Sequence, residues 1–298
     1  MRTHGLGRLR SKRWEHWGIV SPEVILGLTL VDLAYVRMAG IYLLDRASGA
    51  ESTAQAHLPK PSSMHLTAHC GTGTSSAAGG GVTMAFAEHA SSTRLTATAP
   101  GLTVDLTVPV VADRDVLGVV IPWSDRRFQY SVKDLGRAVM GSVRAGEREF
   151  TLGGEESYAV LDHGRGQWPY RSGWTWAAAA GREGGRQLAL NLGGGWTDGT
   201  GVTENGIFVD GVLHKIHGDL TWTFDRSDYE RPWRIGGRGV DLEFTPVHER
   251  VDSTQLGIIA SSIHQCFGTF TGTVRHPELG VLPIEGLTGW AEEAQHRW

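Results

Sequence analysis

The chain has 298 residues, of which 40% are hydrophobic and 20% are charged. This composition is typical of a folded globular protein and excludes a disordered or largely membrane-embedded chain. The formal net charge of −4 provides no excess of positive charge for a polyanion, so we expect no nucleic-acid partner.

The cysteines and the N-terminus bear on the compartment. Cys70 and Cys266 are far apart in sequence, which predicts two reduced, buried thiols rather than a disulfide scaffold. No apolar run reaches the roughly 18 residues that a membrane span needs. The N-terminus is basic but lacks the apolar core of a signal peptide, which favours a cytoplasmic protein. We interpret this basic start as a solvated end, with weak contact to an anionic membrane surface as the alternative.

The first half of the chain predicts short strands separated by turns. The clearest alternation is in Leu102–Val108, where every second residue is apolar. Ala47–Pro61 and the glycine-rich Gly71–Gly81 are predicted to be a loop and a flexible turn, and Phe128–Val132 is predicted to form a hairpin with Arg137–Val143. The other strands predicted here are Val24–Tyr35, Ile41–Asp45, His65–Cys70, Val82–His89, Thr93–Ala99, Val116–Ile121 and Glu147–Leu152.

The second half continues the same pattern after a junction at Gly153–Glu156. The Asp210-Gly211 pair predicts a two-residue hairpin turn between Ile207–Val209 and Val212–Ile216. The other strands predicted here are Tyr158–Leu161, Trp174–Ala180, Arg186–Leu192, Gly218–Phe224, Val240–Phe244, His248–Asp252, Leu256–Ile259, Ile263–Val274, Val281–Ile284 and Gly286–Glu292. Strands at this spacing favour closed antiparallel barrels or sandwiches. We predict an all-β protein of two antiparallel barrels in tandem, residues 1–154 and 155–298.

A dense polar and aromatic block, DHGRGQWPYRSGWTW, spans Asp162–Trp176. Asp162, His163 and Arg165 follow a predicted strand directly, where side chains can converge on a ligand. A carboxylate beside an imidazole can supply general acid and base. The alternative is a charged turn in which Arg165 pairs with Asp162. On the first interpretation Asp162 is a catalytic candidate, and His163 and Arg165 contact the ligand.

The aromatic residues of this block alternate along the chain. In an extended strand Trp174 and Trp176 share one face, and such a face can hold an apolar chain or stabilise a developing cation. The alternative is that these rings fill a core. The candidate ligand-binding residues of this segment are Trp168, Tyr170, Arg171, Trp174 and Trp176.

A second block contains both asparagines of the chain, Asn191 and Asn205. Asparagine has an uncharged side chain that both donates and accepts hydrogen bonds, which is a reason for its use at these two positions. Asn205 is a candidate ligand-binding residue. Glu204, among apolar and glycine neighbours, is a second candidate proton donor, with exposure in a loop as the alternative. His214 and His217 have a metal-like interval, but a strand places them on opposite faces. We therefore expect no metal and no cofactor.

Several segments together resemble one family. They are RWEHW, DHGRGQWPYRSGWTWA, NLGG, TENGIFVDGVLHKI, RPW, QCFGTFTG and GLTGWAEE, in this order over nearly the whole chain. They resemble the uncharacterised domain family DUF2804, in which many members are expected to carry a further segment before RWEHW. More distantly, the family is similar to carotenoid 1,2-hydratases and AttH-like proteins, which implies two lipocalin-like barrels.

The resemblance implies an apolar ligand or substrate but no particular catalytic residue. Relatives of that architecture bind lipids, or catalyse hydration, isomerisation or cyclisation of apolar molecules. We therefore expect a protein that binds a hydrophobic small molecule such as a lipid or isoprenoid. The alternatives are a hydratase, isomerase or cyclase that uses acid catalysis, and a structural or partner-binding module with no ligand.

Overall fold

Antiparallel β-strands make up almost all of the regular structure. The computed structural model describes residues 10–256 and 259–297, and within these the helical residues are confined to short 3-10 turns such as Pro61–Ser63. The all-β prediction is confirmed. In the described part of the chain, no helix has the length and the apolar character needed to cross a membrane.

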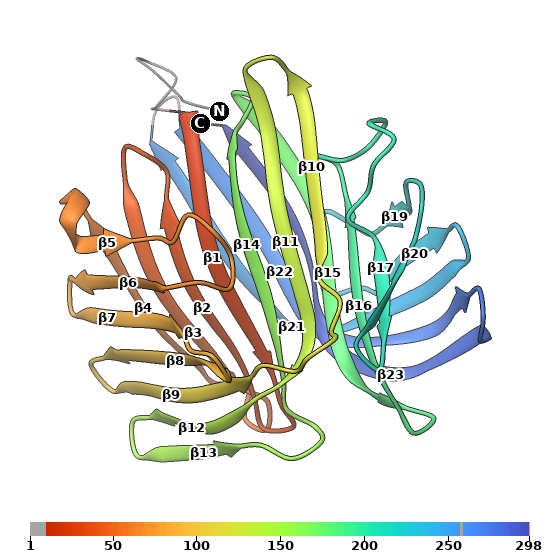
Figure 1. Cartoon of the computed structure of the whole chain (residues 1–298), viewed down its shortest axis with the longest axis horizontal. Helices are drawn as coiled ribbons and strands as arrows, with labels where there is room; N and C mark the ends of the chain where they lie inside the picture. The colour runs from red at the N-terminus through yellow and green to blue at the C-terminus, as the bar shows by residue number, and fades with distance from the viewer. Residues whose placement is uncertain (1–9, 257–258, 298) are drawn as a thin grey trace. The chain divides into compact units, whose positions relative to one another are not determined.

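The chain divides into two compact units (Figure 1). The first unit comprises the described residues up to Arg114 together with Phe128–Gln167. The second comprises Asp115–Arg127 and the described residues from Trp168 onward. The boundary predicted after residue 154 falls inside the first unit, directly before the strand β14 (Tyr158–Gln167).

Two antiparallel sheets form the first unit. One runs β11-β14-β1-β2-β3-β4 within this unit, and the other runs β13-β12-β9-β8-β7-β6-β5. The strands of the first sheet are β1 (Ser11–Val20), β2 (Val24–Asp32), β3 (Arg37–Asp45), β4 (Glu51–Leu58), β11 (Arg127–Ala138) and β14. Those of the second are β5 (Met64–His65), β6 (Thr74–Gly79), β7 (Val82–Glu88), β8 (Ser92–Ala99), β9 (Leu102–Pro109), β12 (Met140–Ala145) and β13 (Arg148–Leu152).

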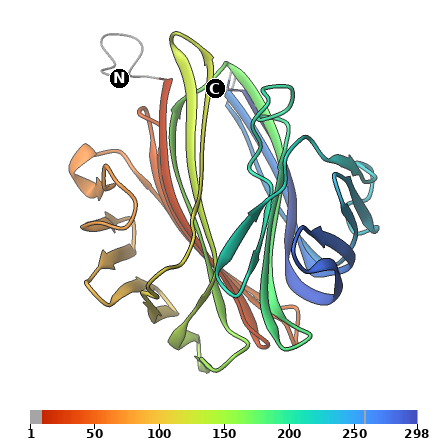
Figure 2. The same ribbon diagram turned by 45° about the vertical axis from the view of Figure 1, so that its right-hand side comes forward.

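One apolar core lies between these two sheets (Figure 2). Trp17 and Leu28 contribute to it from the first sheet, and Phe86 and Leu106 from the second. The predicted alternation in β9 is confirmed, because every second residue from Leu102 onward is buried in this core. Burial of one face of each strand fixes the register, since a shift by one residue would expose the whole apolar set.

A nine-stranded antiparallel sheet, in the order β18-β17-β16-β15-β23-β22-β21-β20-β19, forms most of the second unit. Its strands are β15 (Arg171–Glu183), β16 (Arg186–Gly194), β17 (Gly206–Val209), β18 (Val212–Lys215), β19 (Thr221–Thr223), β20 (Trp233–Gly237), β21 (Val240–Leu256), β22 (Ile259–His276) and β23 (Gly280–Arg297). A further strand, β10 (Leu117–Ser124), belongs to the segment Asp115–Arg127. A second core on one face of the sheet includes Leu190, Trp233, Phe244 and Phe270.

Three predictions of turns and loops are wrong. The predicted loop Ala47–Pro61 contains β4, whose small side chains pair with β3. The predicted turn Gly71–Gly81 contains β6. The predicted hairpin is instead one continuous strand, β11, followed by β12 in the other sheet. The charged residues before Gly136 favoured a turn, but Gly136 forms a bulge within the strand, and Asp134 is buried there beside Arg137 at 3.5 Å.

Strand lengths were also underestimated in the second unit. β21 and β23 were each predicted as two short strands, because bulges at Pro246/His248 and Phe270/Gly272 interrupt the alternation without ending the strand. β22 was predicted as one strand, Ile263–Val274, which is shorter than the observed strand at both ends. β20 was not predicted. The middle of the predicted strand Leu256–Ile259 lies outside the described residues.

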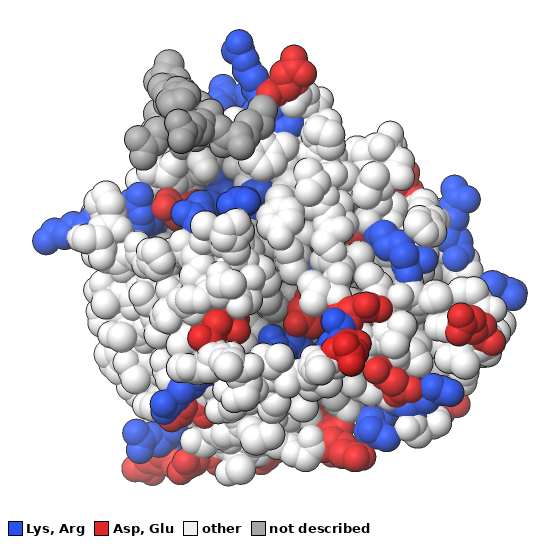
Figure 3. Space-filling model, viewed as in Figure 1, with Lys and Arg blue, Asp and Glu red and all other residues white. Residues whose placement is uncertain are grey.

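Of the basic N-terminal stretch, residues 1–9 lie outside the described residues, and Lys12 is buried. Lys12 is in β1, and its Nζ donates a hydrogen bond to the carbonyl oxygen of Leu33 at 3.2 Å. Burial lowers the pKa of Lys12 to about 8. The predicted solvated end is therefore wrong for Lys12. On the face drawn in Figure 3, Lys and Arg as well as Asp and Glu are scattered among uncharged residues.

Candidate functional site

Strand β15 presents aromatic residues on one face and core residues on the other. Trp174 and Trp176 share a face, as predicted, whereas Ala177 and Ala179 point into the core of the second unit. The alternation of a strand produces this division. On the neighbouring strand β23, Trp290 pairs with Ala178 and lies on the Trp176 side, with its ring centroid 5.3 Å from that of Trp176.

A buried carboxylate lies between these indoles. Glu292 of β23 is opposite Trp176 in the ladder, and it accepts a hydrogen bond from Trp174 Nε1 at 2.9 Å. Gln265 of β22 donates to its other oxygen at 2.9 Å. Trp174 also stacks on His296, with ring centroids 4.5 Å apart. These contacts fix the orientation of the Trp174 ring.

Asn191 holds the other end of this face. Its Oδ1 accepts a hydrogen bond from Trp176 Nε1 at 2.9 Å, and its Nδ2 donates to the carbonyl oxygen of Glu204 at 2.5 Å. The side chain therefore donates and accepts at once, which is the property that the sequence indicated for asparagine. Asn191 is fully buried, so neither partner has water as a substitute.

Glu204 extends the same face. Its side chain lies against Gly193, which is opposite Trp176 in the ladder, and a Cβ at Gly193 would collide with the carboxylate. Trp196 Nε1 donates to Glu204 Oε1 at 2.7 Å. Glu204 is 2% exposed, so the alternative of exposure in a loop is wrong. Burial lowers the pKa of Lys215 to about 8, and the nearby charge of Glu204 opposes this effect.

We call this surface the Trp–carboxylate face, defined by Trp174, Trp176, Trp290, Glu204 and Glu292. Trp168 packs edge-on against Trp174 at 5.3 Å and so extends it. Asn205 contributes indirectly: its Oδ1 accepts from the backbone N–H of Gly193 at 2.7 Å, and its Nδ2 donates to the Gly218 carbonyl at 3.3 Å. Both ends of Asn205 thus organise backbone next to the face.

The residues predicted from Asp162 to Arg165 belong to the first unit. They lie within β14 and not in a turn after a strand, which corrects the prediction. Asp162 forms a buried ion pair with Lys133 at 3.0 Å, so the alternative pairing with Arg165 is wrong. Alternation directs His163 and Arg165 to the opposite face. Arg165 donates there to the carbonyl oxygen of Ala68 at 2.9 Å.

The structure shows a buried acid beside His163 that the sequence did not indicate. Glu15 of β1 is opposite His163 in the ladder, and burial raises the pKa of Glu15. Its oxygens accept hydrogen bonds from Ser75 Oγ at 2.5 Å and Trp17 Nε1 at 3.1 Å. Burial also lowers the pKa of His163. The sequence feature that could have indicated Glu15 is its position as the single carboxylate within the aromatic segment RWEHW.

Two more acids, Glu292 and Glu293, are functional candidates that the sequence pattern did not single out. They are adjacent on β23 and point to opposite faces. Glu293 accepts hydrogen bonds from the Arg226 guanidinium, the shortest at 2.7 Å, and from the Tyr229 hydroxyl at 2.7 Å. The sequence feature that could have indicated these two acids is an acidic pair inside an apolar strand. Only the register of β23 shows which of the two acids faces the tryptophans.

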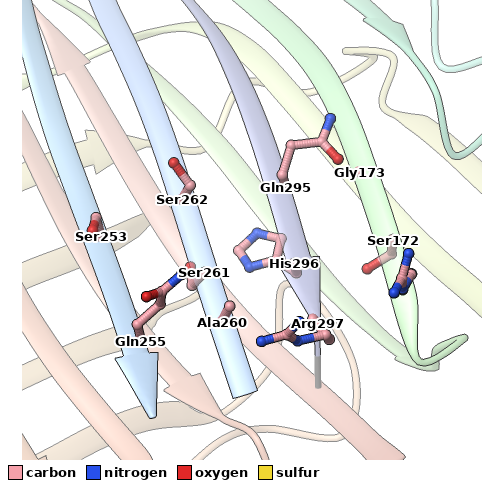
Figure 4. A pocket seen from close by; sticks show the side chains of 11 residues that line it. Ser172, Gly173, Ser253, Gln255, Ala260, Ser261, Ser262, Gln295, His296 and Arg297 are labelled. Carbon is pink, nitrogen blue, oxygen red and sulfur yellow. The ribbon is translucent and has the colours of Figure 1, made fainter. Parts of the chain in front are cut away.

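A pocket of about 590 Å³ opens at the ends of β15, β21, β22 and β23 (Figure 4). Arg171, one of the predicted ligand-binding residues, lines it together with Arg297. His296 also lines it, and the same ring stacks on Trp174. The pocket therefore adjoins the Trp–carboxylate face. Tyr170, just before β15, is 41% exposed.

The histidines of the second block have no metal-site geometry. His214 of β18 stacks on His276, with ring centroids 3.9 Å apart. Among the described residues, no group of three or more His, Cys, Asp or Glu side chains is arranged to hold a metal ion. Both cysteines are free thiols, with Cys266 buried and Cys70 half-buried.

Comparison with known proteins identifies the family. The family profile named Domain of unknown function (DUF2804) matches residues 3–298, and the chain belongs to this family. No curated protein matches the sequence. The resemblance indicated by the sequence motifs is thus confirmed.

Solved structures share the fold at low sequence identity. An AttH protein from Nitrosomonas europaea is 12% identical with a TM-score of 0.60, and the match covers 95% of this chain and 91% of that one. CghA is 13% identical with a TM-score of 0.58, covering 96% and 88%. Kievitone hydratase from Nectria haematococca is 11% identical with a TM-score of 0.58, covering 99% and 93%. At these identities the likeness concerns the fold.

Proposed function

We propose that this protein binds a hydrophobic small molecule, such as a lipid or isoprenoid, on the Trp–carboxylate face of its second unit. In this proposal each unit is one lipocalin-like barrel, and the protein is cytoplasmic. Indole faces provide large, rigid apolar surfaces, and the polar groups among them orient a ligand. Trp168, Trp174 and Trp176 supply the apolar contact, with Glu204 and Glu292 at its polar end.

One observation carries the proposal: Trp174 connects a pocket to a buried carboxylate. Its ring stacks on the pocket residue His296, and its Nε1 donates to Glu292. A tryptophan whose only role is to fill a core packs among apolar side chains, as Trp233 does beside Phe244. Trp174 is instead half-buried among polar groups next to an opening.

Two structural neighbours are known with a bound compound or by a reaction. CghA has also been solved with Sch210972. The name of kievitone hydratase states addition of water to its substrate. Because the likeness concerns the fold, these proteins support a small-molecule site and leave the class of the ligand to experiment.

The first test is a titration of tryptophan fluorescence with farnesol, together with native mass spectrometry of the freshly purified protein. We expect saturable quenching, and about three- to tenfold weaker binding in Trp174→Phe, since aromatic contacts contribute about 0.5–1.5 kcal/mol. Trp222→Phe is the matched control, because Trp222 packs against the core of the second unit. Quenching by neither farnesol nor lipids, with a clean apo mass, would contradict the proposal.

The second candidate function is a hydratase, isomerase or cyclase. The observation that favours it is the burial of Glu204 beside indoles, since a buried acid can protonate a double bond and an aromatic face can stabilise the resulting cation. Asp162 stays the alternative acid in the first unit.

Substitution of the two acids distinguishes enzyme from binder. In an enzyme, Glu204→Gln should lower turnover by 100-fold or more, in the range of ~10²–10⁴ for loss of an acid, with little effect on binding. Asp162→Asn is the parallel variant. If the protein converts a substrate and both variants keep full activity, neither Glu204 nor Asp162 is the catalytic acid. If the protein neither binds nor converts apolar molecules, the remaining alternative is a structural or partner-binding module with no ligand.

A further inference from the structure

The pocket at the strand ends has a charge pattern that the proposed function does not use. Arg171 of β15 is directly opposite Arg297 of β23 in the ladder. Both arginines line the pocket, and none of the described residues that line it is Asp or Glu.

Uncharged hydrogen-bonding groups continue this surface across four strands. Arg297 is opposite Ala260, and Ala260 is opposite Gln255, so the arginine pair and Gln255 share one face. Two residues further along the strands, Gln295 and Ser262 lie on the same face. Ala260 lies in the arginine row, and the side chain of Gln295 lies over Gly173, where a Cβ would collide with it.

The pocket therefore combines two guanidinium groups with amides and hydroxyls (Figure 4). Guanidinium groups bind carboxylate and phosphate oxygens with paired hydrogen bonds. The amides and hydroxyls suit the polar groups of an organic molecule. A volume of about 590 Å³ is in the range of small-molecule sites and exceeds what a bare inorganic anion fills.

We infer that this pocket binds a small organic anion, with its carboxylate or phosphate group between Arg171 and Arg297. Gln255, Ser262 and Gln295 bind the polar substituents of this anion. The anion contacts the face of β15 that carries Arg171, whereas Trp174 lies on the opposite face. The two proposed sites therefore use different sides of the strand, and His296 borders both. Binding of the anion does not require binding of an apolar molecule.

The test is isothermal titration calorimetry at constant ionic strength, with citrate as the carboxylate probe and glucose 6-phosphate as the phosphate probe. Glucose serves as the neutral comparison. We expect one of the two anions to bind and glucose not to bind. Arg171→Gln and Arg297→Gln should each weaken binding at least tenfold, because a hydrogen bond to a charged group contributes about 1.5–3 kcal/mol. Arg171→Lys should bind with intermediate affinity, since the charge remains and the paired geometry is lost.

The matched control is Arg182→Gln, the same change at the opposite end of β15. It should bind the anion as the wild type does. Absence of binding by both anions would overturn the inference, and so would binding that the Arg171 and Arg297 variants retain. Farnesol quenching measured in the same variants separates this outcome from failure of the proposed function, because those variants keep Trp174.

Discussion

Asn191 is the residue with the most demanding position on the Trp–carboxylate face. It is fully buried, and it satisfies both the indole of Trp176 and the backbone carbonyl of Glu204. An amide can do this, whereas an aliphatic side chain leaves both partners without a hydrogen bond in a place that water does not reach.

Replacing Asn191 by Ala should therefore lower the free energy of unfolding by about 2–4 kcal/mol, from two buried groups left unsatisfied. Chemical denaturation measures this value. A double-mutant cycle with Trp176→Phe should show that the two losses do not add, because both remove the same hydrogen bond. Additive losses would show that the Asn191–Trp176 bond contributes little.

The burial of Glu15 predicts how the stability of the protein changes with pH. Burial raises its pKa above the ordinary value of 4.5, so the unfolded chain loses the proton first as the pH rises. Its contribution to stability is complete below about pH 4.5 and is lost as the pH rises through the folded-state pKa. Glu15→Gln cannot ionise, so its stability relative to the wild type should increase with pH, by about 1.4 kcal/mol for every pH unit between the two pKa values.

Thermal or chemical unfolding at several pH values from about 4 to about 8 tests this trend. Taking the difference between wild type and variant at each pH removes the opposing contribution of His163, whose pKa burial lowers. The exposed acid Glu147, changed to Gln, is the matched control for the substitution itself. A difference that is constant over the range would contradict the burial argument.

At the scale of single strands, β22 and β23 depend on a close approach of backbones. Gly289 of β23 is opposite Gly268 of β22. A Cβ at Gly289 would collide with the backbone of Ala178 and Ala179 on β15. Gly268 is equally close to backbone, because a Cβ there would collide with the carbonyl group of Thr245 on β21.

Gly289→Ala should lower the free energy of unfolding by more than about 2 kcal/mol, because backbone atoms cannot move aside for the methyl group. Gly40→Ala in β3 is the matched control: its Cβ would meet nothing within 4 Å, so it should be neutral or slightly stabilising. Equal effects of the two substitutions would show that the strands shift to accommodate Gly289→Ala.

At the scale of the whole molecule, each unit has its own core. The described core residues of the first unit, such as Leu28, and those of the second, such as Leu190, form two separate clusters. Among the described tryptophans only Trp14 and Trp17 belong to the first unit, so fluorescence reports mainly on the second.

Leu28→Ala and Leu190→Ala should therefore act on different transitions. Each should lower the stability of its own unit by about 2–5 kcal/mol. Denaturation followed by circular dichroism should show the effect of either substitution, whereas tryptophan fluorescence should respond mainly to Leu190→Ala. Equal responses of both signals to both variants would indicate that the two cores unfold as one.

The sequence by itself determined the all-β class, the family, the shared face of Trp174 and Trp176 and the hairpin at Asp210-Gly211. These features depend on alternation, turn chemistry and motif order, which are local properties of a chain. A period of two is visible wherever one face of a strand is buried.

Only the tertiary structure decided which side chains meet. Glu292 reaches Trp174 through the register of β15 and β23, and Glu15 faces His163 through that of β1 and β14. The pairing of Arg171 with Arg297 joins positions 126 residues apart (297 − 171) in the same way. Register is fixed by burial over a whole sheet, and bulges shift it without a clear local signal, so the sites follow from the fold as a whole.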